Sequence, residues 1–209
     1  MHYPVARKTL FPLIRLGIKS VEGIEFVPKD QPFLVAANHV GLLDPLFVGA
    51  PIVEASGRLI RFLVDPHKKY WRYFGRYSQW WTHAIPTPTR EDDHDAWFRH
   101  VESYLQRGDC IGIFPEGEVS HAQHLLQPKL GLLRIAQDTG VPILPIGIRR
   151  MHPLAHAFIG SESVRLRIGK PILIPRETDP RSYPAQADAI MEELSRLSGI
   201  PYPPEQHYG

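Results

Sequence analysis

Residues 33–44 read Phe-Leu-Val-Ala-Ala-Asn-His-Val-Gly-Leu-Leu-Asp, and this stretch decides the fold that we expect. Its first five residues are all apolar, which predicts a short strand buried on both faces of a parallel sheet. His39 follows the end of that strand, and Asp44 comes five positions later, just before a proline that can open a helix. A carboxylate beside an imidazole fixes the imidazole tautomer and leaves the other ring nitrogen as a base. The stretch therefore predicts a strand-end site built on His39 and Asp44.

The composition indicates one domain and excludes several classes of protein. The chain has 209 residues, enough for a single domain with a real core. Its 24 Lys and Arg residues nearly balance 22 Asp and Glu residues, so the net charge of +2 argues against a nucleic-acid partner. Cys110 is the only cysteine, which excludes an intramolecular disulfide and favours a reducing compartment. No apolar run reaches the roughly 18 residues of a membrane-spanning helix. We therefore expect a cytoplasmic protein, soluble or peripheral on the inner face of the membrane.

Apolar periodicity alternates between strands and helices along the chain, which predicts an α/β fold. We expect a single domain with a mixed, mostly parallel sheet flanked by helices. The last predicted strand alternates polar and apolar residues and is expected to be exposed. The predicted strands cover residues 24–27, 33–37, 58–64, 83–86, 110–114, 143–148 and 164–168, and the predicted helices cover residues 7–19, 45–55, 91–107, 129–139 and 185–197.

Two segments carry apolar faces beside basic residues, and their roles stay open at this point. A helix over residues 7–19 would either lie on anionic lipid or pack on the domain, and Pro12 limits it to about two turns. Residues 68–81 are rich in Tyr, Trp and Phe at helical spacing, which is most typical of core. The other interpretations are an acyl-chain wall, an interfacial belt or a nucleic-acid platform. We assign any peripheral membrane contact to residues 7–19 and 68–81.

A second polar loop follows another buried strand. The apolar residues 110–114 lead into residues 115–120, which read Pro-Glu-Gly-Glu-Val-Ser. In open parallel sheets, ligand sites gather at the carboxyl ends of the strands. If the two strands are close in the sheet, Glu116 and Gly117 approach the His39–Asp44 pair. The strand order itself is not readable from the sequence.

The chain lacks the usual signatures of an enzyme nucleophile. It contains no Gly-x-Ser-x-Gly elbow, and Cys110 lies in an apolar strand, where a thiol is inert. The pair of His39 and Asp44 matches the serine-protease arrangement without its serine. We therefore expect the nucleophile to be a hydroxyl group of the substrate.

Four short motifs in order carry a resemblance to a known family. The first is Asn38-His39-x-x-x-x-Asp44, and the second is Phe-Pro-Glu-Gly-x-x-Ser over residues 114–120. Lys129-x-Gly131 and Val-Pro-Ile-Leu-Pro-Ile over residues 141–146 follow at similar spacing. Together they resemble the sequence blocks of the glycerolipid and lysophospholipid acyltransferases, typified by 1-acyl-glycerol-3-phosphate acyltransferase of the PlsC type. The implied organisation is an N-terminal amphipathic segment over residues 1–20, an acyltransferase domain over residues 21–200 and an irregular tail over residues 201–209.

The resemblance implies transfer of a fatty acyl group from a thioester to the hydroxyl of a glycerolipid-like acceptor. Acyl-CoA or acyl-carrier protein would be the co-substrate, and the resemblance implies no cofactor and no metal. His39 would act as the general base, and Asp44 would orient it. The implied substrate-binding residues are Asn38, Arg90, Glu116, Gly117, Ser120 and Lys129.

The loop over residues 115–120 departs from the family pattern. The family usually has Thr-Arg after the Glu-Gly pair, and its arginine is associated with the phosphate of the acceptor. This chain has Glu118 and Val119 at those positions. Because an acidic side chain repels a phosphate, we hypothesise a different acceptor, one without a phosphate, whose hydroxyl or amine takes the acyl group.

Two other functions stay open on the sequence alone. His121 and His124, with Glu116 or Glu118, have the residue types of a metal-dependent hydrolase site. A non-catalytic lipid-binding protein would use the apolar surfaces and leave His39 a structural role. Activity that survives a strong chelator would argue against the hydrolase. Loss of turnover in His39→Ala, with binding retained, would argue against the binding protein.

Overall fold

The computed structural model describes residues 3–67, 83–88, 93–120, 123–150 and 163–202. The strands in this part of the chain are β1 (Ile18–Glu22), β2 (Leu34–Ala37), β3 (Ile60–Val64), β4 (Ile85–Pro86), β5 (Cys110–Ile113), β6 (Ile143–Arg150) and β7 (Val164–Ile168). The helices are α1 (Tyr3–Leu16), α2 (Asp44–Ser56), α4 (His94–Gln106), α5 (Gly131–Thr139) and α6 (Tyr183–Ser198), with 3-10 turns η1 (Ile24–Phe26) and η3 (Pro180–Ser182).

The described strands form one seven-stranded sheet in the order β1-β7-β6-β2-β5-β3-β4. β2 is central and runs parallel to both of its neighbours, β5 and β6. β3 is parallel to β5 and to β4, whereas β7 is antiparallel to β6. The prediction of a mixed, mostly parallel sheet is therefore confirmed. Because β2 and β5 are adjacent and parallel, the loops after them leave the sheet side by side.

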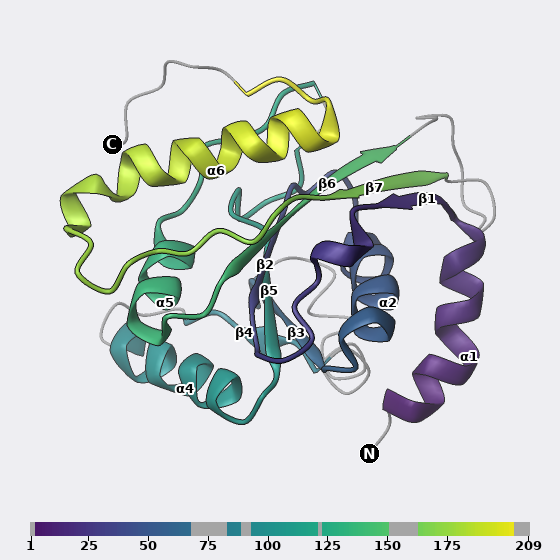
Figure 1. Ribbon diagram of the computed structural model, residues 1–209, viewed down its shortest axis with the longest axis horizontal. Coiled ribbons are helices and arrows are strands. Elements are labelled where there is room, and N and C mark those ends of the chain that lie inside the picture. The colour runs from purple at the N-terminus through teal and green to yellow at the C-terminus, as the bar shows by residue number, and fades with distance from the viewer. Residues whose placement is uncertain (1–2, 68–82, 89–92, 121–122, 151–162, 203–209) are drawn as a thin grey trace.

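Helices cover both faces of the sheet (Figure 1). α1 and α2 lie on one side, and α4, α5 and α6 lie on the other. The central strands read as continuous apolar runs because both of their faces are covered, and residues 34–37 of β2 are all 0% exposed. This burial holds the carboxyl end of β2, where the His39 motif begins, rigidly in place.

The N-terminal helix extends further than its proline suggested. α1 continues through Pro12 to Leu16, so the limit of about two turns was wrong. Pro12 lies on the exposed side of the helix, where water can satisfy the carbonyl that it leaves unbonded. Phe11 and Ile14 are buried in the core, so this helix packs on the domain. Packing on the domain was one of the two interpretations of this segment.

Three predictions about the strands were wrong. Residues 24–26 form the turn η1, and Gly23 in the left-handed region (φ 79°) separates it from β1, which was not predicted as a strand. β7 was expected to be exposed, but it is an interior strand between β1 and β6, and its alternate residues Val164, Leu166 and Ile168 are buried. The aromatic segment 68–81 lies outside the described residues, as does the tail after residue 202.

Candidate active site

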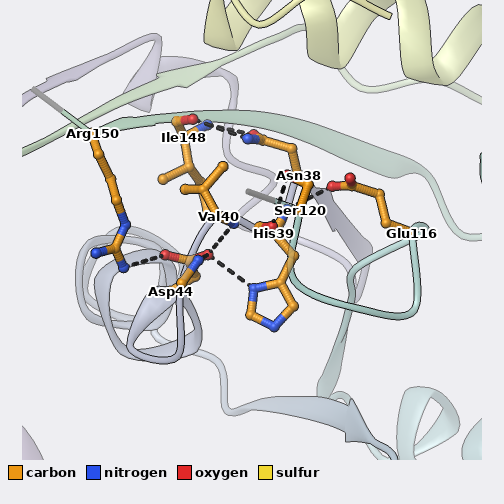
Figure 2. A network of polar contacts seen from close by, with 9 residues as sticks. Asn38, His39, Val40, Asp44, Glu116, Ser120, Ile148 and Arg150 are labelled. Carbon is orange, nitrogen blue, oxygen red and sulfur yellow. Dashed lines mark hydrogen bonds and ion pairs between the residues drawn. The ribbon is translucent and has the colours of Figure 1, made fainter. Parts of the chain in front are cut away.

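The His39–Asp44 pair forms at the carboxyl end of β2. His39 Nδ1 lies 2.9 Å from Asp44 Oδ2, and Asp44 is the first residue of α2. The same oxygen accepts hydrogen bonds from the backbone N–H groups of Val40 and Gly41, both at 2.7 Å. These bonds fold the loop back on itself, so the two side chains meet where the loop leads into α2. The arrangement is drawn in Figure 2.

The pairing fixes which nitrogen of His39 is available. Asp44 is 0% exposed and accepts from Nδ1, so in the neutral imidazole Nδ1 carries the proton and Nε2 carries the lone pair. The His39 side chain is 16% exposed, and Figure 2 shows its second nitrogen turned away from the network. Nε2 is therefore placed to take a proton from a bound molecule.

Two phenylalanine rings support the imidazole. The His39 ring stacks on Phe114, with ring centroids 4.1 Å apart and planes inclined by 18°. Phe114 in turn stacks on Phe62 of β3 at 5.5 Å. Sequence reasoning placed Phe114 in a motif without giving it this role. The stack restricts rotation of the histidine ring about its side-chain bonds.

The loop after β5 forms hydrogen bonds with both the N–H and the carbonyl of His39. Glu116 Oε1 accepts the N–H of His39 at 2.8 Å, and Ser120 donates to the His39 carbonyl through its own N–H at 2.7 Å and its Oγ at 3.1 Å. The second Glu116 oxygen accepts the N–H of Leu126 at 2.9 Å. The expected convergence of the two loops is confirmed, and both Glu116 and Ser120 hold the histidine in position.

Glu116 is a buried carboxyl group. It is 4% exposed, and this burial raises the pKa of Glu116 above its ordinary value, while the hydrogen bonds from Leu126 and His39 act in the opposite direction. Both carboxyl oxygens are used inside the protein. The geometry therefore gives Glu116 a bracing role between the two loops, in addition to any contact with substrate.

Asn38 ties β2 to β6 next to the histidine. Its amide nitrogen donates to the Ile148 carbonyl at 3.0 Å, and its amide oxygen accepts the Ile148 N–H at 2.7 Å. Asn38 is 0% exposed. The carboxamide replaces the ladder hydrogen bonds that β2 would make one residue further on, and it fixes the point from which His39 projects.

Gly117 and Lys129 lie against each other beside the loop. Gly117 is in the left-handed region (φ 71°), and a Cβ added there would lie 2.6 Å from Lys129 Cε. Lys129 is exposed, and its backbone N–H donates to the Pro115 carbonyl at 2.8 Å. Lys129 therefore offers an exposed cation close to the second loop. Arg90 lies outside the described residues.

One charged neighbour of the pair was missed by sequence reasoning. Arg150, the last residue of β6, places Nη2 3.3 Å from Asp44 Oδ1. No motif indicated it, because it follows the apolar run of β6 and lies 106 positions from Asp44 in the chain. The carboxylate of Asp44 is thus bound through both of its oxygens.

The structure also bears on Cys110 and on the hypothesis of a metal site. Burial raises the pKa of the Cys110 thiol to about 12, which agrees with an inert core cysteine. Across the described residues, no three His, Cys, Asp or Glu side chains gather into a group that could hold a metal ion. His121 lies outside those residues, and His124 is exposed.

Fold and site together define a class of protein: an α/β domain with a buried aspartate, a histidine whose outer nitrogen faces outward, and a second loop that braces the histidine backbone. The family model for Acyltransferase matches residues 19–149, and the chain belongs to this family.

Named relatives are about a quarter to a third identical to this chain over the segments that align. It is 31% identical to the 1-acyl-sn-glycerol-3-phosphate acyltransferase of Neisseria meningitidis over 116 residues, 56% of this chain and 43% of the relative. It is 27% identical to the lyso-ornithine lipid O-acyltransferase of Rhizobium meliloti over 145 residues, 69% of this chain and 47% of the relative. The chain thus spans about half the length of these relatives.

A solved structure shares the fold. The crystal structure of the 1-acyl-sn-glycerophosphate acyltransferase of Thermotoga maritima superposes with a TM-score of 0.62 at 22% identity, covering 93% of this chain and 83% of that one. In this chain, no helix within the described residues is long and apolar enough to cross a membrane.

Proposed function

We propose that this protein is an O-acyltransferase that moves a fatty acyl group from an acyl thioester to the hydroxyl of a glycerolipid-like acceptor. The observation that carries the proposal is the His39–Asp44 pair, in which Nδ1 is bound to a buried carboxylate and Nε2 faces outward. Membership of the Acyltransferase family supports the reaction class.

In the proposed reaction, His39 is the general base and then the general acid. Nε2 takes the proton of the acceptor hydroxyl as its oxygen attacks the thioester carbonyl carbon. When the tetrahedral intermediate collapses, the C–S bond breaks and the thiolate receives that proton from Nε2. Asp44 holds the ring and stabilises the imidazolium ion, and general base action of this kind contributes about a hundredfold to ten-thousandfold. Acyl-CoA or acyl-carrier protein would supply the thioester, with no further cofactor.

The acceptor is proposed to lack a phosphate group. Glu118 is exposed and Val119 is half-buried in the loop next to the histidine, where the family usually carries Thr-Arg. An exposed carboxylate there opposes a phosphate dianion and favours a neutral or cationic headgroup. The relative named for a lyso-ornithine lipid supports this direction, whereas others are named for glycerol phosphates.

The test supplies acyl-CoA or acyl-carrier protein with three acceptors: lysophosphatidic acid, monoacylglycerol and a lyso-ornithine lipid. Free thiol and acylated product are followed together, with and without a strong chelator. We expect equal amounts of thiol and product with an acceptor that lacks phosphate. Thiol release without product would indicate a thioesterase, and loss of activity with chelator would favour the metal-dependent hydrolase.

A double substitution sharpens the acceptor question. Glu118→Thr with Val119→Arg restores the usual family residues, so it should raise kcat/KM for lysophosphatidic acid over that of the unaltered protein. Val119→Leu is the matched control, since it adds bulk without charge. A clear preference of the unaltered protein for lysophosphatidic acid would contradict the phosphate-free acceptor.

We also propose peripheral contact between α1 and the inner face of the membrane. Leu13 and Leu16 are 54% and 78% exposed, although their neighbours Phe11 and Ile14 are buried. Lys19 is exposed just after the helix. An apolar surface beside cations suits an anionic lipid surface. Since the proposed acceptor is a lipid, contact between α1 and the membrane would bring the site to its substrate.

A further inference from the structure

Arg150 contacts the oxygen of Asp44 that His39 does not use. Oδ2 accepts from His39 Nδ1 and from the two backbone N–H groups of the loop, and Oδ1 faces Arg150 Nη2 at 3.3 Å. Figure 2 shows the guanidinium and the imidazole on opposite sides of the carboxylate. The two sides of Asp44 are therefore held by different elements, β6 and the histidine loop.

The contact between Arg150 and Asp44 matters because the Asp44 side chain is buried. The Asp44 side chain is 0% exposed and that of Arg150 is 20% exposed. A buried carboxylate needs a compensating charge or hydrogen bonds to stay ionised. Arginine keeps its positive charge at all relevant pH values, so the compensation does not depend on the protonation state of His39. A carboxylate held at both oxygens also cannot rotate away from the imidazole.

The histidine loop leaves space for the guanidinium. A Cβ added at Gly41 would lie 1.8 Å from Arg150 Nη2 and 2.3 Å from Arg150 Cζ. Any side chain at Gly41 would displace the guanidinium from this place. Gly41 also donates its N–H to Asp44 Oδ2, so the same residue binds the carboxylate and makes room for its cation.

Arg150 is itself placed by the end of β6. Two residues earlier, Ile148 is tied to Asn38 through both backbone polar groups, and Arg150 pairs with Val164 of β7. The residue between them, Arg149, is exposed on the other face. β6 thus contacts the site at two points: Ile148 binds Asn38, and Arg150 binds Asp44.

We infer that Arg150 is a positioning residue for the reaction proposed above: it holds the Asp44 carboxylate so that Oδ2 accepts Nδ1–H of His39, in the space that Gly41 leaves open. Arg150 acts through Asp44 and does not take part in the proton transfer. This role rests on the proposed function only for its effect on rate, since its effect on the histidine tautomer is independent of any substrate.

The experiment compares Arg150→Gln and Arg150→Lys with Arg149→Gln, a matched control that removes the same charge from the adjacent exposed residue. For Arg150→Gln we expect kcat to fall about 10- to 100-fold, as for a displaced catalytic group, with KM for acyl-CoA little changed. Arg150→Lys should recover part of the loss, and Arg149→Gln should behave as the unaltered protein. Unchanged kcat in Arg150→Gln would overturn the inference.

A spectroscopic measurement keeps the inference testable without turnover. In protein labelled with 15N at the histidine rings, His39 should report the Nδ1–H tautomer in the unaltered protein and a mixture of tautomers in Arg150→Gln. An unchanged His39 signal would overturn the positioning role even if kcat falls. If Arg150→Gln does not fold, Gly41→Ala replaces it, because the added methyl displaces the same guanidinium and should give the same mixture.

Discussion

Both backbone polar groups of His39 are bound by one loop, at a distance of 77 to 81 positions in the sequence. Its N–H donates to Glu116, and its carbonyl accepts from Ser120. At the scale of single residues, the position of His39 thus depends on a carboxylate that binds its backbone N–H. The contribution of Glu116 is therefore separate from that of Asp44, which binds the imidazole itself.

Glu116→Gln should weaken both the fold and the reaction. A carboxylate accepts two N–H groups, whereas a glutamine side chain offers one acceptor oxygen, so either His39 or Leu126 loses its partner. A buried unsatisfied N–H costs about 1–3 kcal/mol. Urea denaturation at neutral pH measures this loss, with the exposed Glu177→Gln as control. Equal stability of Glu116→Gln and the unaltered protein would contradict the bracing role.

The raised pKa of Glu116 predicts that the stability of the protein depends on pH. Burial raises the pKa of Glu116 in the folded protein above its ordinary value of 4.5. The stability that comes from this raised pKa is fully present below 4.5 and is lost as the pH rises through the folded value. The free energy of unfolding of the unaltered protein, relative to Glu116→Gln, should therefore decrease with rising pH above 4.5. A pH-independent difference would show that the carboxyl group titrates normally.

At the scale of elements, the decisive junction is between the ends of β2 and β6. Asn38 satisfies the N–H and the carbonyl of Ile148 at once, and it directly precedes His39. The junction aligns β2, which leads into His39, with β6, which carries Arg150. Loss of the Asn38–Ile148 hydrogen bonds should therefore lower the stability of the protein and alter the geometry of the site.

Asn38→Ala should lower the free energy of unfolding by at least about 2 kcal/mol, because two buried backbone groups lose their partners. Asn38→Asp keeps the acceptor oxygen and removes the amide donor. If the new carboxylate takes up a proton, the loss of unfolding free energy should be smaller than in Asn38→Ala. If the carboxylate stays charged, that loss should be larger. Urea denaturation of both variants measures this. A loss of less than about 0.5 kcal/mol in Asn38→Ala, typical of surface substitutions, would contradict the junction.

The same elements explain what the sequence could predict. β2, β5 and residues 143–148 of β6 are buried, so apolar residues fit there and their runs were readable. β1 reads Ile-Lys-Ser-Val-Glu and lies at the edge of the sheet, where one-sided burial leaves no clear period. His39 and Asp44 were predicted because they are close in sequence. The contact of Arg150 with Asp44 joins residues 106 positions apart, and no local pattern encodes it.

At the scale of the whole molecule, the domain combines a rigid site with an exposed apolar surface on its first helix. The core side of α1 is anchored by Phe11 and Ile14, and Arg15 forms an ion pair with Glu54 of α2. The leucines on the outer side contribute little to the core. Membrane contact, if made by this surface, is therefore separable from folding.

Leu13→Gln with Leu16→Gln should weaken binding to vesicles that contain anionic lipid, because about 1.5–3 kcal/mol of apolar burial per leucine is removed from the contact. Thermal unfolding should change little. Leu173→Gln is a matched control, since Leu173 is also exposed, at 67%, in another part of the chain. Vesicle flotation measures binding, and equal flotation of the double variant and the control would contradict contact through α1.

In the proposed reaction, His39 is the general base for acyl transfer. The most direct measurement is a single-turnover assay of His39→Ala with acyl-CoA and the best acceptor, with acyl-CoA binding determined on the same protein. The proposal predicts a rate at least about a hundredfold lower with the dissociation constant for acyl-CoA nearly unchanged. Acylated product formed at the rate of the unaltered protein would contradict it.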